Sequence, residues 1–190
     1  MERLTFRAAV RASPEELASA DGRMVPDLVA PDLDVLFCGI NPGLTSGATA
    51  THFAGPGNRF WKVLHLSGFT PLVLAPTDQD QLLSYGLGIT NLSSRTTATA
   101  AELTKEELRS GAVLLTHKVA QLRPRYVAFL GMQSYRTAFR RPRATVGPQP
   151  EQVADAKAWL LPNPSGLQAR YQLPELVDLY GALRQAVGRG

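Results

Sequence analysis

The sequence predicts a single α/β domain in which helices cover both faces of a parallel sheet. Four short apolar segments with the character of buried strands alternate with helical segments, which is the order expected for such a sheet. The length of 190 residues fits one domain, and neither a linker nor an internal repeat divides it. No stretch approaches the roughly 18 apolar residues that a membrane-spanning helix needs, so we expect no membrane segment.

Residues 1–24 are predicted to be an N-terminal extension, and residues 25–190 to form the domain. Within the extension, Ser13 and Pro14 have the order of an N-cap followed by the first residue of a short helix. Terminal segments are usually poorly ordered unless something ties them down, so we expect a loosely attached extension. The opening residues lack the long apolar segment of a secretory signal, which predicts that the protein is not exported.

The first predicted strand runs into a glycine-rich loop. An apolar run rises to Cys38 and breaks at Gly39–Gly43 (GINPG), a pattern typical of a buried strand that feeds a turn. Residues 44–57 are rich in Gly, Thr and Ser and are predicted as loop. A helix is then predicted to begin near Asn58 and to end at Gly68, with its aromatic side chains in the core.

The rest of the chain continues the alternation of strands and helices. Thr77 is predicted to cap a short helix that extends to about residue 83, with acids in its first turn. Thr104 and Glu107 have the spacing of a capping box for a long helix that ends near Leu122. The remaining predicted elements are three strands at 87–92, 125–131 and 158–161, and two helices at 132–139 and 173–187.

The charge of the chain suggests a polyanionic partner. The formal net charge is +4, but residues 1–34 contain seven acids and four arginines, whereas residues 35–190 contain sixteen basic residues and nine acids. Charged runs are more often solvated faces than binding sites, so this imbalance only raises the expectation of nucleic-acid binding. Four arginines lie together at one predicted helix end, and they can form either a solvated face or contacts to phosphate: Arg136, Arg140, Arg141 and Arg143.

Neither a metal site nor a cofactor is predicted. Cys38 is the only cysteine, which excludes an internal disulfide and a four-cysteine metal site, and we expect it to be a buried thiol. His52, His65 and His117 do not have the spacing of metal ligands.

Two Asn-Pro loops follow different strands of the predicted sheet, at Gly39–Gly43 and at Asn163–Leu167. Because the carboxyl ends of parallel strands share one edge, both loops can face a common cleft, together with the polar stretch 93–97. Neither loop contains a carboxylate, a Ser-His pair or a phosphate-binding glycine pattern. Leu167 is an apolar residue in an otherwise polar turn. These features favour a functional cleft over two structural turns.

Four features follow one another along the chain: GINPG (Gly39–Gly43), Phe53, NRFW (Asn58–Trp61) and NPSGL (Asn163–Leu167). In these features and their order, the chain resembles the mismatch-specific uracil-DNA glycosylase and thymine-DNA glycosylase family of the uracil-DNA glycosylase superfamily. The resemblance runs from about Val25 to the C-terminus. It implies a single-domain three-layer sandwich with a short central parallel sheet flanked by helices.

The resemblance also implies an activity. The expected enzyme is a monofunctional DNA glycosylase of base excision repair that flips uracil mispaired with guanine out of double-stranded DNA and hydrolyses its N-glycosidic bond. Thymine and other damaged pyrimidines are further candidate bases, so the expected partner is duplex DNA with G·U or G·T mispairs. We expect a cytoplasmic monomer without cofactor, associated with the nucleoid if the source is bacterial.

The first motif supplies the expected active site. Asn41 matches the catalytic asparagine, which holds the water that attacks the sugar C1′. The base pocket would consist of Ile40, Gly43, Ser46 and Phe53, with the Phe53 ring stacked on the pyrimidine. Gly43 stands where related uracil-only enzymes have a Tyr that excludes the thymine methyl, so the pocket has room for groups at C5 of the base.

The second motif supplies the expected DNA wedge. Leu167 matches the residue that fills the gap left by the flipped nucleotide, and Gly166 and Gln168 match positions whose backbone reads the opposite guanine. Bacterial members often continue with Ser and Arg after the wedge, whereas Gln168 and Ala169 follow here. The loop is completed by Asn163, Pro164 and Ser165, and the expected phosphate contacts are Arg59, Arg95 and Arg170.

The predicted rate of base excision is low. An amide cannot titrate, so Asn41 can only orient water. A carboxylate about 4 Å from the sugar cation would be worth about 4 kcal/mol at an effective dielectric of ~20, or roughly a thousandfold in rate. Only Asp78 and Asp80 are weak candidates to supply one. The alternative function is a non-catalytic module that binds mismatched or damaged DNA. A small-molecule hydrolase is disfavoured because no pair of nucleophile and base is present.

Overall fold

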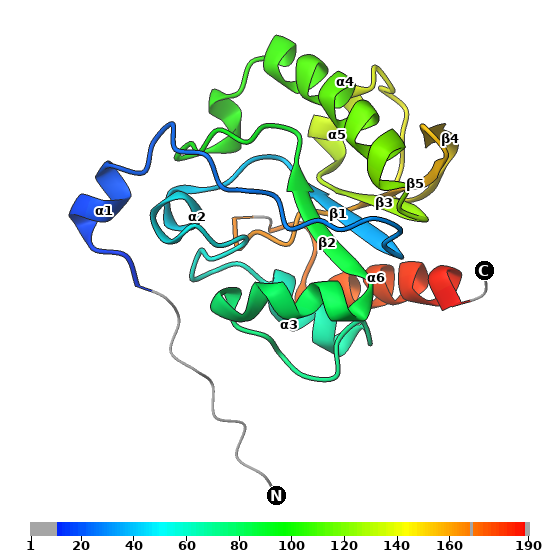
Figure 1. Cartoon of the computed structure of the whole chain (residues 1–190), viewed down its shortest axis with the longest axis horizontal. Helices are drawn as coiled ribbons and strands as arrows, with labels where there is room; N and C mark the ends of the chain where they lie inside the picture. Colours follow the sequence, from blue (N-terminus) through cyan, green and yellow to red (C-terminus); the bar gives the residue numbers. More distant parts are fainter. Residues whose placement is uncertain (1–10, 168, 189–190) are drawn as a thin grey trace, which may run out of the picture.

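The computed structural model describes residues 11–167 and 169–188 and has a five-stranded sheet at its centre (Figure 1). The strand order is β2-β1-β3-β5-β4. Four strands are parallel: β1 (Val35–Gly39), β2 (Leu87–Asn91), β3 (Tyr126–Leu130) and β5 (Ala156–Leu161). At one edge, β4 (Gly147–Val153) runs antiparallel to β5.

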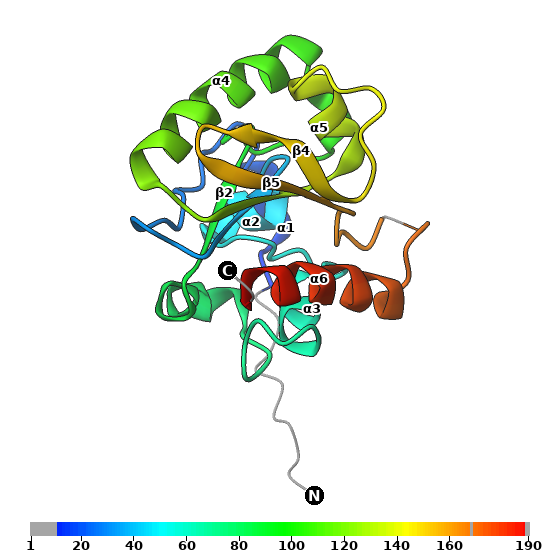
Figure 2. The ribbon, with the colours of Figure 1, turned by 90° about the vertical axis from the view of Figure 1, so that its right-hand side faces the viewer.

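Helices cover both faces of the sheet, which confirms the predicted three-layer sandwich (Figure 2). One face carries α4 (Lys105–Leu122) and α5 (Met132–Ala138). The other face carries α3 (Phe60–Leu66), the 3₁₀ helix η1 (Pro76–Tyr85) and α6 (Leu173–Gly188). Within the described residues, no helix combines the length and the apolar character needed to cross a membrane.

The central strand β1 divides its side chains between the two cores. Phe37 contacts Phe60 edge-on at a centroid distance of 5.5 Å and lies stacked on Tyr180 at 6.4 Å, within the core under α3 and α6. Leu36 and Cys38 face α4 and α5 instead. Cys38 is a buried free thiol, as predicted, and its burial raises the pKa of the thiol. All residues of β1 are buried because helices cover both sides of it.

Helix α4 begins as its capping box predicts. Thr104 Oγ1 accepts a hydrogen bond from the Glu107 backbone N–H at 3.0 Å, and the Glu107 carboxylate accepts one from the Thr104 N–H at 2.8 Å. The helix ends before Arg123, which has a left-handed backbone with φ of 50°. The reciprocal cap satisfies two backbone groups of the first turn, so the local sequence is sufficient to fix this boundary.

Two helices differ from their prediction. Residues predicted as loop form α2 (Leu44–Thr49), because close packing supports this glycine-containing segment where intrinsic propensity does not. A Cβ at Gly47 would lie 2.6 Å from the Thr96 side chain, so only glycine allows this approach. The N-cap of η1 is Ala75 and not Thr77, because a proline occupies its first helical position.

Strand β4 is absent from the prediction because its sequence, GPQPEQV, contains residues that are rare inside strands. Its position at the sheet edge explains this composition, since a proline without an N–H is tolerated where one side of the strand is open. The sheet is therefore mixed and not wholly parallel. The neighbouring β5 also begins two residues earlier than predicted, at Ala156.

The described part of the N-terminal extension is held against the domain, contrary to the expected loose attachment. It contains α1 (Pro14–Ala18), which lies beside α2 (Figure 1). The Gly22 N–H donates to the Thr96 carbonyl at 3.0 Å, and the Thr96 N–H donates to the Arg23 carbonyl at 2.9 Å. Residues 1–10 lie outside the described part of the chain.

Candidate functional site

A cavity of about 780 Å³ opens where the parallel strands end. Gly39–Gly43 follow β1 and line one side of it, and Asn163 and Ser165–Leu167 follow β5 and line another. Asn91 at the end of β2 and Leu130 at the end of β3 also line it. The fold therefore brings the two Asn-Pro loops into one cavity, as the shared edge of a parallel sheet requires.

The amide of Asn41 is fixed by three acceptors. The two hydrogens of its Nδ2 serve three acceptors, the carbonyls of Pro42 and Arg95, both at 3.1 Å, and Thr97 Oγ1 at 2.6 Å, so one hydrogen is shared between two of them. The Thr97 hydroxyl donates its only hydrogen to the Thr99 carbonyl at 2.7 Å, so toward Asn41 it can only accept. This pattern sets the orientation of the amide. Asn41 Oδ1 accepts no hydrogen bond from the described residues, which leaves it available to bind a water in the cavity.

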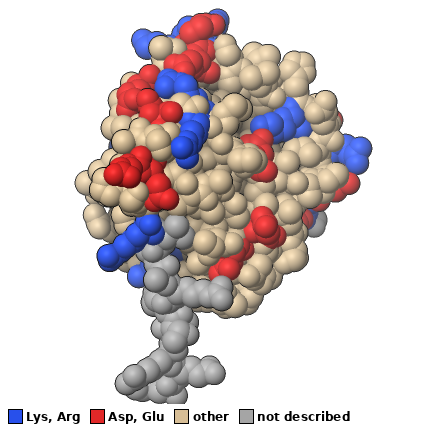
Figure 3. All heavy atoms as spheres, turned by 60° about the vertical axis from the view of Figure 1, so that its left-hand side comes forward, with Lys and Arg blue, Asp and Glu red and all other residues tan. Residues whose placement is uncertain are grey.

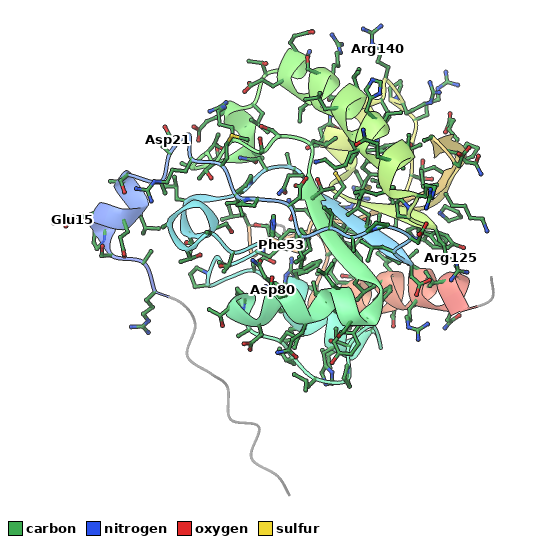
Figure 4. The ribbon with its side chains drawn as sticks, in the orientation of Figure 1. Glu15, Asp21, Phe53, Asp80, Arg125 and Arg140 are labelled. Carbon is green, nitrogen blue, oxygen red and sulfur yellow. The ribbon has the colours of Figure 1, made fainter. Side chains whose placement is uncertain are left out.

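Phe53 provides an aromatic wall of the cavity. One face of its ring stacks on Phe60 of α3, with a centroid distance of 4.0 Å and an interplanar angle of 28°. Its backbone φ is 52°, an unusual value for an aromatic residue that is maintained only where the surrounding contacts impose it. In Figure 4 its side chain lies between α2 and the sheet. A planar ligand could stack on the half-exposed ring.

The other predicted pocket residues, Ile40, Gly43 and Ser46, also line the cavity, and two of them already have hydrogen-bond partners within the protein. Ser46 is buried, and its Oγ accepts a hydrogen bond from the Ala54 N–H at 3.2 Å. The Ile40 carbonyl accepts a hydrogen bond from the Ser93 N–H at 2.9 Å, so this backbone group serves the fold. A Cβ at Gly43 would meet no atom of the described residues within 4 Å, which leaves open space at this wall.

Asn91 is a cavity residue that the sequence analysis did not identify. Its Nδ2 is buried and has no hydrogen-bond partner among the described residues, although buried amides are rarely left unpaired. A Cβ at Gly39 would lie 2.4 Å from Asn91 Oδ1, so the glycine makes room for this side chain. The only local signal is its position at the end of a predicted strand. An unpaired donor in a cavity is suited to a ligand that offers an oxygen.

The second loop presents Leu167 to solvent, with 88% of its surface exposed. Asn163 Oδ1 accepts a hydrogen bond from the Ser165 N–H at 2.9 Å, and Ser165 Oγ accepts one from the Leu167 N–H at 3.3 Å. Gly166 lies against the backbone of Gly57, so closely that a Cβ at Gly166 would be 2.5 Å from the Gly57 carbonyl oxygen. Gln168, the predicted partner of Gly166 in reading guanine, lies outside the described residues.

The predicted phosphate-binding arginines have internal partners. Arg59 donates to the backbone carbonyls of Pro164 and Ser165 in the second loop and to that of Tyr171 beyond it, which argues against its expected phosphate contact. Arg95 pairs with Glu107 at 2.9 Å, and the Arg170 guanidinium lies over the Tyr171 ring at 5.5 Å. In the arginine cluster at the end of α5, Arg136 donates to the Ala144 carbonyl and Arg141 pairs with Glu151. Figure 4 shows Arg140 on the α4 side of the molecule, away from Phe53.

The cavity is uncharged along its described lining. No Asp, Glu, Lys or Arg is among the described residues that line it, and the two acids considered above, Asp78 and Asp80, are not part of it. His52 lines it, and burial lowers the pKa of its imidazole. On the face in Figure 3, acidic and basic groups are intermixed and neither forms a continuous patch. No group of three metal-ligating side chains occurs among the described residues.

Comparison with known proteins gives a consistent result. Residues 26–184 match the model of the Uracil DNA glycosylase superfamily. The chain is also similar to a solution NMR structure from Methanosarcina acetivorans that is provisionally described as a uracil DNA glycosylase. The two share 16% sequence identity at a TM-score of 0.58, and the match covers 86% of this chain and 97% of the other. This likeness supports the fold.

Proposed function

The chain belongs to the uracil DNA glycosylase superfamily, and from this we propose that it is a monofunctional DNA glycosylase that excises uracil mispaired with guanine in double-stranded DNA. Thymine and other damaged pyrimidines opposite guanine are proposed as further substrates. The observation that carries the proposal is the shared cavity, in which the fixed amide of Asn41 and the exposed Leu167 come together from opposite ends of the chain.

The proposal begins with extrusion of the base. A uracil in a duplex cannot reach Asn41, so it must leave the stack at a cost of a few kcal/mol. Leu167 protrudes beside the cavity and offsets part of this cost by filling the vacated space. A G·U or G·T mispair is held less firmly than a regular pair, which favours extrusion at mismatches.

The cavity then holds the base. The free face of Phe53 offers a stacking surface, and the unpaired Nδ2 of Asn91 offers a donor to a carbonyl oxygen of the pyrimidine. Both contacts suit uracil and thymine, which differ only by the methyl group at C5. The open space at Gly43 accommodates that methyl group if it points toward this wall.

The proposed reaction is hydrolysis through a sugar cation. As the bond between C1′ and the base breaks, positive charge develops on the sugar and negative charge on the base, and donors near the base stabilise its departure. A water held by Asn41 Oδ1 forms the new bond to C1′ and gives up a proton to solvent or to the departing base. Because no carboxylate is among the described residues of the cavity, we expect slow turnover.

Alkaline cleavage of a labelled duplex tests this function. A duplex with one G·U pair is incubated with excess protein and then heated in alkali, so that strand breakage reports an abasic site. We expect breakage at the uracil, and less breakage in a duplex with an A·U pair. Specific binding of the G·U duplex without breakage would instead support a non-catalytic mismatch-binding module.

Gly43→Tyr should narrow the range of bases. The substitution fills the open wall of the pocket, and we expect excision of thymine opposite guanine to fall at least tenfold relative to excision of uracil, in line with the discrimination that steric fit provides. The measurement is the ratio of single-turnover rates on G·T and G·U duplexes. Gly43→Ala is the control, because its small side chain meets no neighbour within 4 Å. An unchanged ratio in Gly43→Tyr would place the C5 position elsewhere.

Thr97→Val should slow excision while leaving DNA binding intact. Valine keeps the shape of threonine but removes the acceptor at the shortest distance from Asn41 Nδ2, so only the carbonyls of Pro42 and Arg95 still hold the amide and it leaves its productive orientation more often. We expect a fall of about tenfold in the single-turnover rate. Thr116→Val on α4 is the matched control, since it also removes a hydroxyl that donates to a backbone carbonyl.

A further inference from the structure

Arg59 connects the two ends of the loop that carries Leu167. On the incoming side, its Nε donates to the Pro164 carbonyl at 3.2 Å and its Nη2 to the Ser165 carbonyl at 2.9 Å. On the outgoing side, its Nη1 donates to the Tyr171 carbonyl at 2.7 Å. The exposed tip of the loop therefore projects from a base that one guanidinium holds closed.

The backbone strengthens the same connection. The Arg59 N–H donates to the Pro164 carbonyl at 3.0 Å, so main chain and side chain converge on one oxygen. The planar guanidinium presents several donors in a fixed arrangement, whereas a lysine ammonium is a point charge on a flexible stem. Only an arginine can serve three carbonyls in this geometry.

Arg59 also precedes the residue that supports the stacking surface. Phe60 follows it at the start of α3, and the Phe60 ring lies under Phe53. The beginning of α3 thus fixes both the aromatic wall of the cavity and the base of the wedge loop. Adjacent residues of one helix end therefore contact both Phe53 and the loop that carries Leu167.

We propose that Arg59 is a positioning residue that ties the Pro164 and Ser165 carbonyls to the Tyr171 carbonyl and so holds Leu167 ready to enter the duplex. The role in DNA rests on the proposed glycosylase function, whereas the closure of the loop does not. Without Arg59, the loop would have to be ordered at each encounter with DNA, and the entropy of that ordering would slow base flipping.

Hydrogen exchange tests the closure without requiring activity. Amides of residues 163–172 should exchange at least about tenfold faster in Arg59→Ala and Arg59→Lys than in the unaltered protein. Peptides from β1 and β3 should exchange at unchanged rates, which shows that the core is folded. Lys62→Ala is the matched control, because it removes an exposed charge from the same helix. Unchanged exchange of the loop in both Arg59 variants would overturn the proposal.

Kinetics separate positioning from phosphate binding. For a positioning residue, both Arg59 variants should lower the single-turnover rate on a G·U duplex about tenfold at saturating enzyme, with the dissociation constant and its salt dependence unchanged. For a phosphate contact, the rate at saturation should persist while binding weakens and the salt slope falls by about one. The second outcome would overturn the positioning role. If the unaltered protein excised no uracil, the proposed function would fail, and hydrogen exchange would still decide whether Arg59 closes the loop.

Discussion

Asn41→Ala should abolish most uracil excision while the protein still binds a G·U duplex. The substitution removes the only carbonyl that we assign to the attacking water, and loss of one oriented polar group at a reacting centre typically lowers the rate by about 100- to 1,000-fold. The proposed contacts to DNA from Leu167 and the loop backbone should remain in this variant. The measurements are the single-turnover rate on a G·U duplex and the dissociation constant for the same duplex.

Gln149→Ala is a suitable control for Asn41→Ala. The Gln149 amide also donates to backbone carbonyls, those of Thr145 at 2.7 Å and Gly147 at 2.9 Å, but it belongs to β4 and does not line the cavity. Both variants lose amide hydrogen bonds, so each should lose about 1–2 kcal/mol of unfolding free energy. Only Asn41→Ala should lose excision. Full excision by Asn41→Ala would remove Asn41 from the mechanism.

Leu167→Ala should slow excision from duplex DNA by roughly 10- to 100-fold, because burial of a leucine side chain in the vacated space contributes about 1.5–3 kcal/mol to the flipped state. The folded protein should be unaffected, since 88% of the Leu167 surface is exposed and its loss removes little from the core. We therefore expect a melting temperature within about 1 °C of the unaltered value. The loss of rate should be smaller on single-stranded DNA, where no gap has to be filled.

The control for Leu167→Ala is Leu114→Ala. Leu114 is also an exposed leucine, with 69% of its surface accessible, but it lies on α4 outside the cavity. Both variants lose the same atoms from the surface, so a general effect of surface hydrophobicity would appear in each. Equal rates for Leu167→Ala and the unaltered protein would show that another residue fills the gap in the duplex.

Much of the fold could be predicted because its signals are local. Strands β1, β3 and β5 are apolar runs that end at or just before Gly or Pro, and the long helix α4 begins at a capping box within four residues. The exceptions are segments whose local sequence favours another state. Strand β4 contains prolines that only an edge position tolerates, and α2 contains a glycine that only its contact with Thr96 explains.

Part of the candidate site could also be predicted from the sequence. The Asn-Pro motifs and their resemblance to a known family pointed to Asn41, Phe53 and Leu167, and the parallel sheet explained why two distant loops share an edge. The sequence did not indicate that Asn91 lines the same cavity with a side-chain donor that none of the described residues pairs. It also suggested that Arg59 binds phosphate, because the sequence does not show whether an arginine next to a motif pairs with DNA or with a carbonyl of the protein itself.

The sequence by itself determined the order of the strands and helices apart from α2 and β4, together with the two motifs, since hydrophobic periodicity, caps and turn residues act over a few neighbouring positions. Only the tertiary structure decided which partners the polar groups have. Arg59 and Ser165 are separated by 106 positions and Asn41 and Thr97 by 56, so no local pattern encodes these hydrogen bonds. They form because packing of the helices on the sheet brings these distant residues together, and they hold the Asn41 amide and the loop that carries Leu167 in place.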